Sequence, residues 1–222
     1  MIRYHPDIIQ GSEEWAALRC GTLTASGIGK LLTPTLKPAS NDASRTYLCD
    51  MIAQRVTRYV EPQFVSDDML RGTMDEITAR DIYSEHHAPV EQTGFVTNDR
   101  WGFTIGYSPD GLVGDDGLIE CKSRRYKYQV ATILAREMPA DYLIQCQTGL
   151  LVTDRKWLDF CSYAGGLPMF VTRIYPDAKV QDAIVSAASL FEEQLAEKMA
   201  LFLRNSAGMI PTERMIEVEM YA

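Results

Sequence analysis

Residues 101–123 read WGFTIGYSPDGLVGDDGLIECKS, two apolar segments that flank a stretch rich in Gly and Asp. We predict strands over 101–107 and 117–123, because both are short, apolar and bounded by turn residues. The turn chemistry of Gly114-Asp115-Asp116-Gly117 places a tight reversal between them. The stretch therefore predicts a β-hairpin.

The hairpin fixes which side chains lie together. Side chains alternate along a strand, so Glu120 and Lys122 share one face while Ile119 and Cys121 share the other. We expect the apolar pair to enter the core, which leaves the acid and the lysine together at the sheet surface. Asp110, on the neighbouring strand or at its edge, comes within reach of both.

Two carboxylates and a lysine suit metal-assisted attack on a phosphodiester. Carboxylates hold hard cations such as Mg²⁺ or Mn²⁺, which prefer oxygen ligands. The cation lowers the pKa of a bound water and offsets phosphate charge, and a lysine can orient that water. The alternative is an ordinary solvated strand face beside an Asp-Gly turn, because a short motif is only a hypothesis.

Size and composition indicate an ordinary globular protein. The 222 residues are 46% hydrophobic and 23% charged, which fits one α/β domain with a sizeable core. No apolar run approaches 18 residues and no signal-peptide pattern opens the chain, so we expect a soluble, cytoplasmic protein. The cysteines show no CxxC spacing, which argues against zinc fingers, iron–sulfur clusters and a disulfide framework: Cys20, Cys49, Cys121, Cys146 and Cys161.

The net charge of −8 argues against a protein that coats nucleic acid, which would normally be basic. It does not exclude a nuclease whose acids hold cations and whose basic residues line one channel.

Periodicity and turn signals predict the order helices, strands, helices, strands, helix. This order is typical of a central mixed β-sheet flanked by helices, in a single domain over residues 1–222. A loop is expected over 33–42, and 204–222 receives no assignment. The expected helices cover 12–19, 24–32, 44–59, 67–86, 139–152 and 177–203, and the strands lie within 90–123 and at 156–163 and 169–175.

Four segments follow one another over about residues 11–155: Trp15–Ser26 (WAALRCGTLTAS), Arg71–Glu76 (RGTMDE), Ser108–Lys122 with its acid…acid-x-lysine pattern, and Tyr142–Gln147 (YLIQCQ). In this order they resemble the phage lambda exonuclease type of viral recombination nuclease, within the restriction-endonuclease-like superfamily. The resemblance implies a restriction-endonuclease-like core, in which each of the four segments contributes residues to a nuclease site.

The resemblance assigns the catalytic roles. It implies that Asp110 and Glu120, with the backbone carbonyl of Cys121, bind Mg²⁺, for which Mn²⁺ is a plausible substitute. Lys122 then positions or deprotonates the attacking water, and Glu76 is a third acid of the site. Taken alone, Glu76 also fits a solvated i,i+4 salt bridge on its helix.

Two glutamines lie two positions apart on the helix over 139–152 and therefore face different directions. The resemblance selects Gln145 for the site, with Tyr142 one turn earlier as a DNA-binding residue. We expect Gln147 to be a buried amide bonded to backbone.

A second cluster is expected where a loop meets a helix start, a geometry that binds anions. The resemblance implies a pocket for a 5′-terminal phosphate built from Arg19, Thr24, Ser26 and Ser108. The alternative is a plain Ser/Thr helix cap beside a surface arginine. Trp15 could stack on a nucleotide, but beside an apolar helix face it is expected in the core.

Residues that line a DNA channel are less evident. The family has basic residues near the N-terminal loop, whereas 31–44 here offers only Lys37. Arg45, Arg55 and Arg58 on the next helix could substitute.

The resemblance therefore implies an Mg²⁺-dependent 5′-to-3′ exonuclease that degrades one strand of linear double-stranded DNA to mononucleotides and leaves 3′ single strands for recombination. It further implies a homotrimeric ring and a single-strand annealing protein as partner. Three alternatives stay open: a restriction- or repair-type endonuclease of the same superfamily, a catalytically inactive DNA-end-binding module, and an unrelated enzyme with a coincidental acid cluster.

Overall fold

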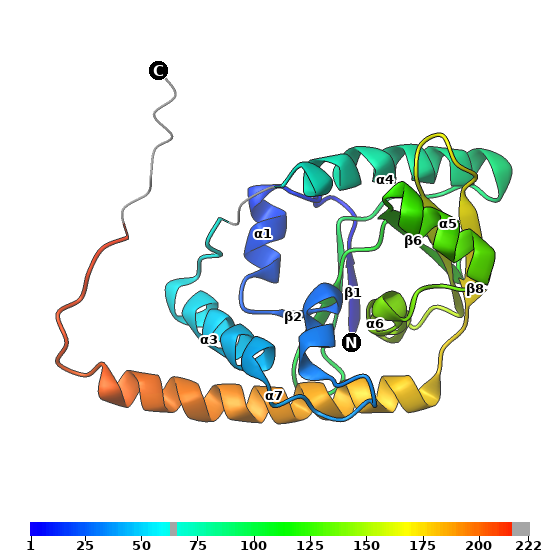
Figure 1. The fold of residues 1–222 in the computed structure, drawn as a ribbon. Coiled ribbons are helices and arrows are strands. Elements are labelled where there is room, and N and C mark those ends of the chain that lie inside the picture. The colour runs from blue at the N-terminus through cyan, green and yellow to red at the C-terminus, as the bar shows by residue number, and fades with distance from the viewer. Residues whose placement is uncertain (63–65, 215–222) are drawn as a thin grey trace, which may run out of the picture.

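Two four-stranded mixed sheets form the centre of the computed structural model, which describes residues 1–62 and 66–214 (Figure 1). The first sheet has the order β1-β3-β4-β2 and the second β5-β6-β7-β8. The strands are β1 (Ile2–His5), β2 (Leu23–Thr24), β3 (Phe95–Asn98), β4 (Ile105–Tyr107), β5 (Gly111–Val113), β6 (Gly117–Ser123), β7 (Trp157–Tyr163) and β8 (Phe170–Ile174).

Helices cover both sheets. In Figure 1, α4 runs along the top of the molecule and α7 along the bottom, with the strands between them. The helices are α1 (Glu13–Arg19), α2 (Ala25–Ile28), α3 (Asp42–Thr57), α4 (Asp67–His86), α5 (Tyr126–Ala135), α6 (Leu143–Thr153) and α7 (Ala178–Asn205), with 3₁₀ turns η1 (Gly29–Leu31) and η2 (Ala140–Tyr142).

Helix α6 joins the two sheets, because it contacts β3 and β4 of the first and β7 of the second. Every residue from Cys146 to Thr153 is buried. The close approach to β4 depends on Gly149, where a Cβ would lie 2.8 Å from the Tyr107 ring. The core is therefore continuous from one sheet to the other.

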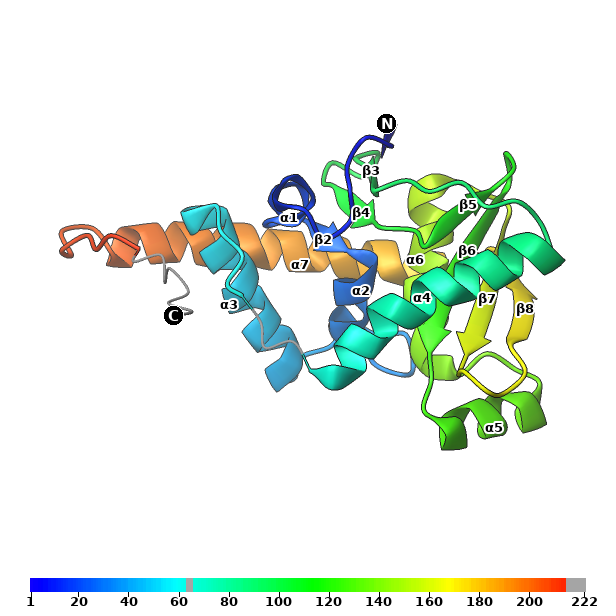
Figure 2. The ribbon, with the colours of Figure 1, turned by 90° about the horizontal axis from the view of Figure 1, so that it is seen from above.

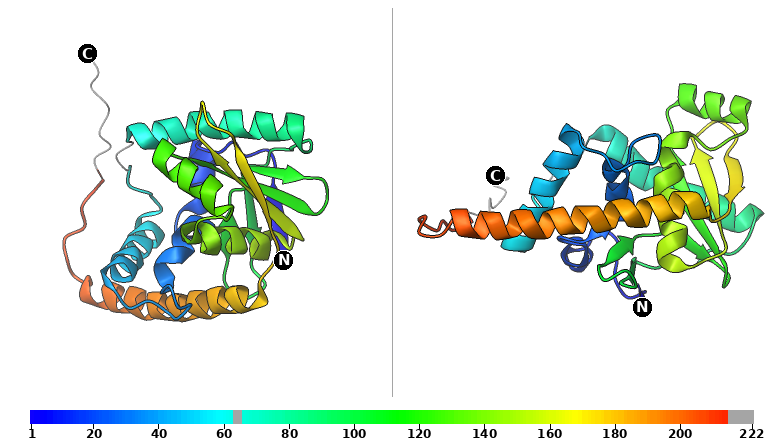
Figure 3. Two further views of the ribbon diagram at one scale, coloured as in Figure 1. Left: turned by 45° about the vertical axis from the view of Figure 1, so that its right-hand side comes forward. Right: turned by 90° about the horizontal axis from the view of Figure 1, so that it is seen from below.

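Helix α7 is amphipathic and long. Asp177 caps its N-terminus by accepting a hydrogen bond from the Val180 amide, and its buried residues recur every three or four positions. It packs on α6 and α3, and its C-terminal end projects past α3 (Figures 2 and 3). This confirms the helix expected over 177–203. In the described part of the chain, no helix has the length and apolar character to cross a membrane.

The hairpin expected between 101–107 and 117–123 is wrong. Strand β4 belongs to the first sheet, where it pairs with β3 and β2. The chain then crosses to the second sheet through residues 108–110, and the hairpin with β6 is made by β5. Beyond the last pair, Gly111↔Ile119, the Asp110 carboxylate accepts the Cys121 amide at 2.6 Å, in place of a backbone carbonyl.

The α/β class is confirmed, with the strands divided between two sheets rather than gathered in one. The pair expected over 156–163 and 169–175 is confirmed as the antiparallel β7 and β8. Glu120 does not lie at a sheet surface, however: it is 1% exposed, because α6 and β4 cover its face of β6. Ile119 and Cys121 enter the core on the other face, against α4.

Candidate active site

Glu120 is the buried centre of the candidate site. Its Oε1 accepts hydrogen bonds from Lys122 Nζ at 2.6 Å and from Gln145 Nε2 at 2.5 Å. Its Oε2 accepts one from the Tyr107 hydroxyl at 2.6 Å. A buried carboxylate is tolerated when it is paired and hydrogen-bonded, and these three donors meet that need.

Asp110 lies beside Glu120 and is 9% exposed. Burial raises the pKa of Asp110 well above its usual value, and the nearby charge of Glu120 raises it further, while Lys122 opposes both effects. A cation bound beside Asp110 would favour its charged form, which makes this position a favourable one for a cation.

Lys122 stays protonated at neutral pH. Burial acts to lower the pKa of Lys122, but the charges of Glu120 and Asp110 outweigh it and raise the pKa above its usual value. The ammonium also lies 5.7 Å from the centre of the Tyr142 ring. As a cation it can donate hydrogen bonds to a water or to phosphate oxygens.

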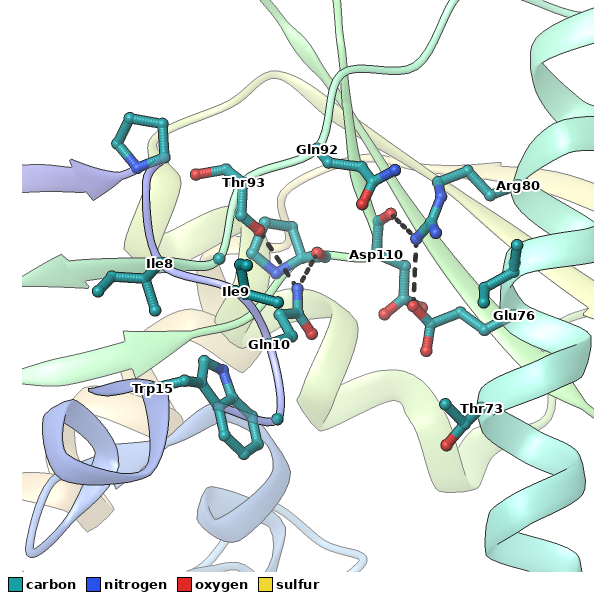
Figure 4. A pocket seen from close by; sticks show the side chains of 15 residues that line it. Ile8, Ile9, Gln10, Trp15, Thr73, Glu76, Arg80, Gln92, Thr93 and Asp110 are labelled. Carbon is teal, nitrogen blue, oxygen red and sulfur yellow. Dashed lines mark hydrogen bonds and ion pairs between the residues drawn. The ribbon is translucent and has the colours of Figure 1, made fainter. Parts of the chain in front are cut away.

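Glu76 reaches the same cluster from α4. It pairs with Arg80 at 3.3 Å, and Arg80 Nη1 also donates to the Asp110 carbonyl at 3.1 Å (Figure 4). Burial raises the pKa of Glu76; Arg80 lowers it in part, and Glu120 raises it again. The i,i+4 salt bridge, which the sequence left as an alternative, is present, and Glu76 also lines the same cavity as Asp110.

The oxygen donors of this cluster fit Mg²⁺ or Mn²⁺. Among residues 1–62 and 66–214, no three His, Cys, Asp or Glu side chains converge into a ready-made metal site. The candidate ligand set is therefore two carboxylates, Asp110 and Glu120, and one backbone carbonyl. In an antiparallel pair, the N–H and C=O of one residue face the same side, so the Cys121 carbonyl faces the edge on which its amide meets Asp110.

The residues expected to hold a 5′ phosphate form a second cluster. Arg19 donates from Nη1 to Ser108 Oγ at 3.1 Å and from Nη2 to Ser26 Oγ at 3.4 Å. The hydroxyl of Thr24 lies 3.3 Å from that of Ser26. No carboxylate in the described ranges pairs with Arg19, so its charge is available to an anion. This cluster is more than a helix cap beside a surface arginine.

Trp15 is half-buried and lies outside the core, contrary to expectation. Its Nε1 donates to Ser108 Oγ at 2.8 Å, and the Arg19 guanidinium stacks 4.2 Å from its ring centre. The indole also lines a cavity of about 460 Å³ that reaches Glu76 and Asp110 (Figure 4). Trp15 therefore connects the two clusters.

The segment over 6–11, for which the sequence offers no motif, forms another wall of this cavity. Gln10 Nε2 donates to the Pro109 carbonyl at 2.8 Å and to the Thr93 carbonyl at 3.2 Å. Gln10 thus holds the segment against the crossing between the sheets. Only these long-range contacts reveal its role.

The two glutamines of α6 divide as expected. Gln145 faces Glu120, whereas Gln147 is 1% exposed, donates to the Tyr175 carbonyl at 2.8 Å and accepts from the Asp177 amide at 2.9 Å. Tyr142 lies beside the site, where its hydroxyl accepts from Arg124 at 2.5 Å.

The arginines suggested for a DNA channel are largely engaged elsewhere. Arg55 makes two hydrogen bonds to Glu192, at 2.6 and 2.8 Å, and a third to the Gly21 carbonyl. Arg45 pairs with Asp42 at 2.5 Å. Arg55 thus holds α3 to α7.

Residues 14–156 match the YqaJ-like viral recombinase domain. The chain belongs to this family. An alkaline exonuclease (LHK-Exo) from Laribacter hongkongensis is 33% identical to this chain and superposes with a TM-score of 0.80, over 90% of this chain and 100% of that one. The same values hold for LHK-Exo in complex with dAMP.

A phage-related exonuclease from Haemophilus somnus 129PT shares the fold at 17% identity and a TM-score of 0.56, over 80% of this chain and 96% of that chain. No curated protein sequence matches the chain. The resemblance to the lambda exonuclease type is confirmed, and the family and the LHK-Exo match support a nuclease function.

Proposed function

We propose that this YqaJ-like recombinase is an Mg²⁺-dependent exonuclease that degrades one strand of linear duplex DNA from its 5′ end. The observation that carries the proposal is the placement of Ser108 and Asp110, two residues apart in the crossing between the sheets. Ser108 belongs to the arginine cluster, and Asp110 belongs to the carboxylate cluster. A phosphate-binding cluster thus lies next to a candidate cutting site.

The arginine cluster sets the register of cutting. A 5′-terminal phosphate bound by Arg19 and Ser26, with Thr24 and Ser108 beside them, places the next phosphodiester at Asp110 and Glu120. Fixing a substrate in one geometry makes one bond the reactive one. Mononucleotides are then released one at a time.

The carboxylate cluster supplies the chemistry. Asp110, Glu120 and the Cys121 carbonyl would hold Mg²⁺, which activates water and offsets charge on the phosphate. Lys122 donates to the attacking water or to a phosphate oxygen, and Gln145 keeps Glu120 in place. Water oxygen bonds to phosphorus as the bond to the 3′ oxygen breaks. The released nucleotide gains a 3′-hydroxyl, and the shortened strand keeps a 5′ phosphate that can re-enter the Arg19 cluster.

The first test is digestion of linear duplex DNA that carries either a 5′-phosphoryl or a 5′-hydroxyl end, with Mg²⁺. We expect rapid release of mononucleotides from the 5′-phosphoryl strand. Lys122→Ala should lower the rate about 100-fold to 10,000-fold, whereas Lys156→Ala, at an exposed salt bridge, should leave it unchanged. Arg19→Gln should abolish the preference for the phosphoryl end.

The competing function is that of an endonuclease from the same superfamily, and closed circular DNA separates the two. An exonuclease needs an end and leaves the circle intact. Equal cutting of circles and linear DNA would exclude the proposal in favour of an endonuclease. Binding of ends without Mg²⁺-dependent turnover would indicate an inactive end-binding module.

A homotrimeric ring and a single-strand annealing partner stay predictions of the resemblance. A closed ring would explain how a chain of net charge −8 stays on DNA. Light scattering coupled to size-exclusion chromatography should give three times the mass of one chain, and a mass of one chain would contradict the ring.

A further inference from the structure

Positive charge gathers directly after Lys122. The next residues include Arg124-Arg125-Tyr126-Lys127-Tyr128, called here the RRYKY segment, and no acidic residue occurs between Lys122 and Glu137. This run is unusual in a chain of net charge −8. It leads from the end of β6 into the first turn of α5. The RRYKY segment therefore directly follows the strand that carries Glu120 and Lys122.

The segment presents aromatic faces to solvent. Tyr126 is 67% exposed and Tyr128 is 48% exposed, although large aromatic side chains are normally half-buried or more. Lys127 Nζ lies 4.8 Å from the Tyr128 ring centre and Arg124 Cζ lies 5.3 Å from it. Cations and exposed aromatic side chains thus alternate along the segment.

A cavity of about 490 Å³ opens beside the segment, lined by Arg124, Arg125 and Tyr126 and, from α4, by Arg71 and two aspartates. Asp68 pairs with both Arg71 and Arg125, and Asp75 accepts a hydrogen bond from Ser123. The cavity still carries more positive than negative charge.

Arg124 is the cation of this cavity that no carboxylate neutralises within residues 1–62 and 66–214. Its Nη1 donates to the Tyr142 hydroxyl, but its buried Nε has no hydrogen-bond partner in that part of the chain. An unsatisfied donor on a charged group is costly, and an anion in the cavity would offset the charge of the Arg124 guanidinium. Tyr142 connects this arginine to Lys122, since both cations lie over its ring.

We propose that the RRYKY segment and this cavity bind unpaired DNA. Tyr126, which lines the cavity, stacks on one base and Tyr128 on another, while Arg124 and Lys127 contact phosphates of the same strand. Stacking on exposed aromatic side chains requires bases free of their partner strand, which favours single strands over duplex as the ligand. The inference rests on the proposed function in one respect: the single strand expected to occupy the site is the 3′ strand that the exonuclease leaves undigested.

The test is the binding of a fluorescent oligo-dT to the full chain in EDTA, which prevents digestion, followed by fluorescence anisotropy. Each of Tyr126→Ala and Tyr128→Ala should weaken binding about tenfold, equivalent to about 1.4 kcal/mol. Tyr126→Phe and Tyr128→Phe should retain it, because the stacking face is kept. Tyr175→Ala, at a tyrosine that is 63% exposed and does not line the cavity, is the matched control and should bind normally.

A salt titration tests the phosphate contacts. Lys127→Ala should reduce the slope of log K against log salt by about 0.7, the value for one phosphate contact on a single strand. Lys198→Ala, an exposed lysine on α7, should leave the slope unchanged. Blunt duplex of the same length should bind the tyrosine variants as it binds the wild type, and circular dichroism should show that they are folded.

Three outcomes would overturn the inference: no binding of oligo-dT by the wild type, equal binding by wild type and both alanine variants, or equal losses for single strand and duplex. Nuclease activity is measured separately on linear duplex with Mg²⁺. An inactive wild type that still binds oligo-dT through these tyrosines would refute the proposed function and leave the single-strand site standing.

Discussion

At the scale of single residues, Glu120 combines burial with charge. Three donors from β4, β6 and α6 surround it, and its neighbour Asp110 has a raised pKa because it is buried beside the same charge. The Tyr107 hydroxyl is affected too: burial, followed by Glu120 and Asp110, raises the pKa of Tyr107 well above its usual value. The charge of Glu120 therefore acts on both Asp110 and Tyr107.

Gln145 and Gln147 permit a contrast between positioning and stability. Gln145→Ala should lower the cleavage rate about tenfold to a hundredfold, as the loss of groups that orient metal ligands generally does. Its thermal stability should change little, because Glu120 keeps two donors. Gln147→Ala should instead lower the free energy of unfolding by about 1–3 kcal/mol, because the Tyr175 carbonyl and the Asp177 amide lose their partner. Single-turnover cleavage rates and urea denaturation of both variants measure the two effects. A Gln145→Ala variant with full activity would contradict the positioning role of Gln145.

Asp110 should make the metal-free protein less stable as pH rises. Its folded-state pKa lies above the unfolded value near 3.8, so the folded state holds a proton that the unfolded state releases. The stabilisation is full below that unfolded pKa and is lost as pH rises through the folded pKa. Thermal melts of the metal-free protein should show Tm falling over this window, and the fall should be smaller in Asp110→Asn. The same pH dependence in both proteins would assign the effect to other groups.

At the scale of elements, the crossing over 108–110 determines the site. It is fixed on one side by Gln10, which donates to the Pro109 carbonyl, and on the other by the Cys121 amide, which donates to Asp110. The segment over 6–11 in turn lies close to Gly94, where a Cβ would be 1.8 Å from the Ile8 carbonyl oxygen. The site thus depends on segments that carry none of its catalytic side chains.

Gly94→Ala should displace the segment over 6–11, because the atom in the way is backbone and cannot rotate aside. We expect a loss of about 1–3 kcal/mol in the free energy of unfolding and faster amide exchange over 6–11. Gly72→Ala is the control: it lies within α4 with open space around its Cβ, and should stabilise the protein by about 0.5–1 kcal/mol. Unchanged exchange in Gly94→Ala would show that the segment is held in another way.

Elements formed by local signals could be predicted, and elements defined by distant pairing could not. Ser12 caps α1 and the 3.6-residue periodicity marks α7, so both follow from neighbours in sequence. Strand β2 has two residues and exists through its pairing with β4, which no local pattern encodes. The expected hairpin is misplaced for the same reason, because local sequence does not show that β4 pairs with β2 and β3 rather than with β6. The resemblance brought together Asp110, Glu120, Lys122 and Gln145, whereas Gln10 and the position of Trp15 required the tertiary structure.

At the scale of the whole molecule, α7 connects parts that are far apart in sequence. It packs on α6 behind the candidate site and on α3 near the loop after α1. Arg55 of α3 joins Glu192 of α7 and donates to the Gly21 carbonyl, two residues after Arg19. The arginine cluster is thus supported through Arg55 by the long helix.

Glu192→Ala should lower the free energy of unfolding by about 1–3 kcal/mol, because it leaves a half-buried guanidinium with only the Gly21 carbonyl. The exposed neighbour Glu193 provides the control, since Glu193→Ala should change stability by less than about 0.5 kcal/mol. We further expect Glu192→Ala to weaken the preference for 5′-phosphoryl ends while the maximal rate is kept. Chemical denaturation and end-preference assays measure the two effects, and a variant as stable as the wild type would contradict the first.

The three hydrogen-bond donors around Glu120 affect the order in which site residues are lost when such a domain loses its activity during evolution. A lineage released from selection for cleavage would still be selected to fold, and loss of Glu120 would leave the Tyr107 hydroxyl and the Gln145 amide without their acceptor inside the protein. Lys122 is partly exposed, and after its loss Glu120 keeps the donors from Tyr107 and Gln145, so the lysine can be replaced at a smaller folding cost. In degenerate copies of this domain, the lysine should therefore disappear before the glutamate. A surviving Glu120 is then weak evidence of an active enzyme, and a surviving Lys122 is the better diagnostic.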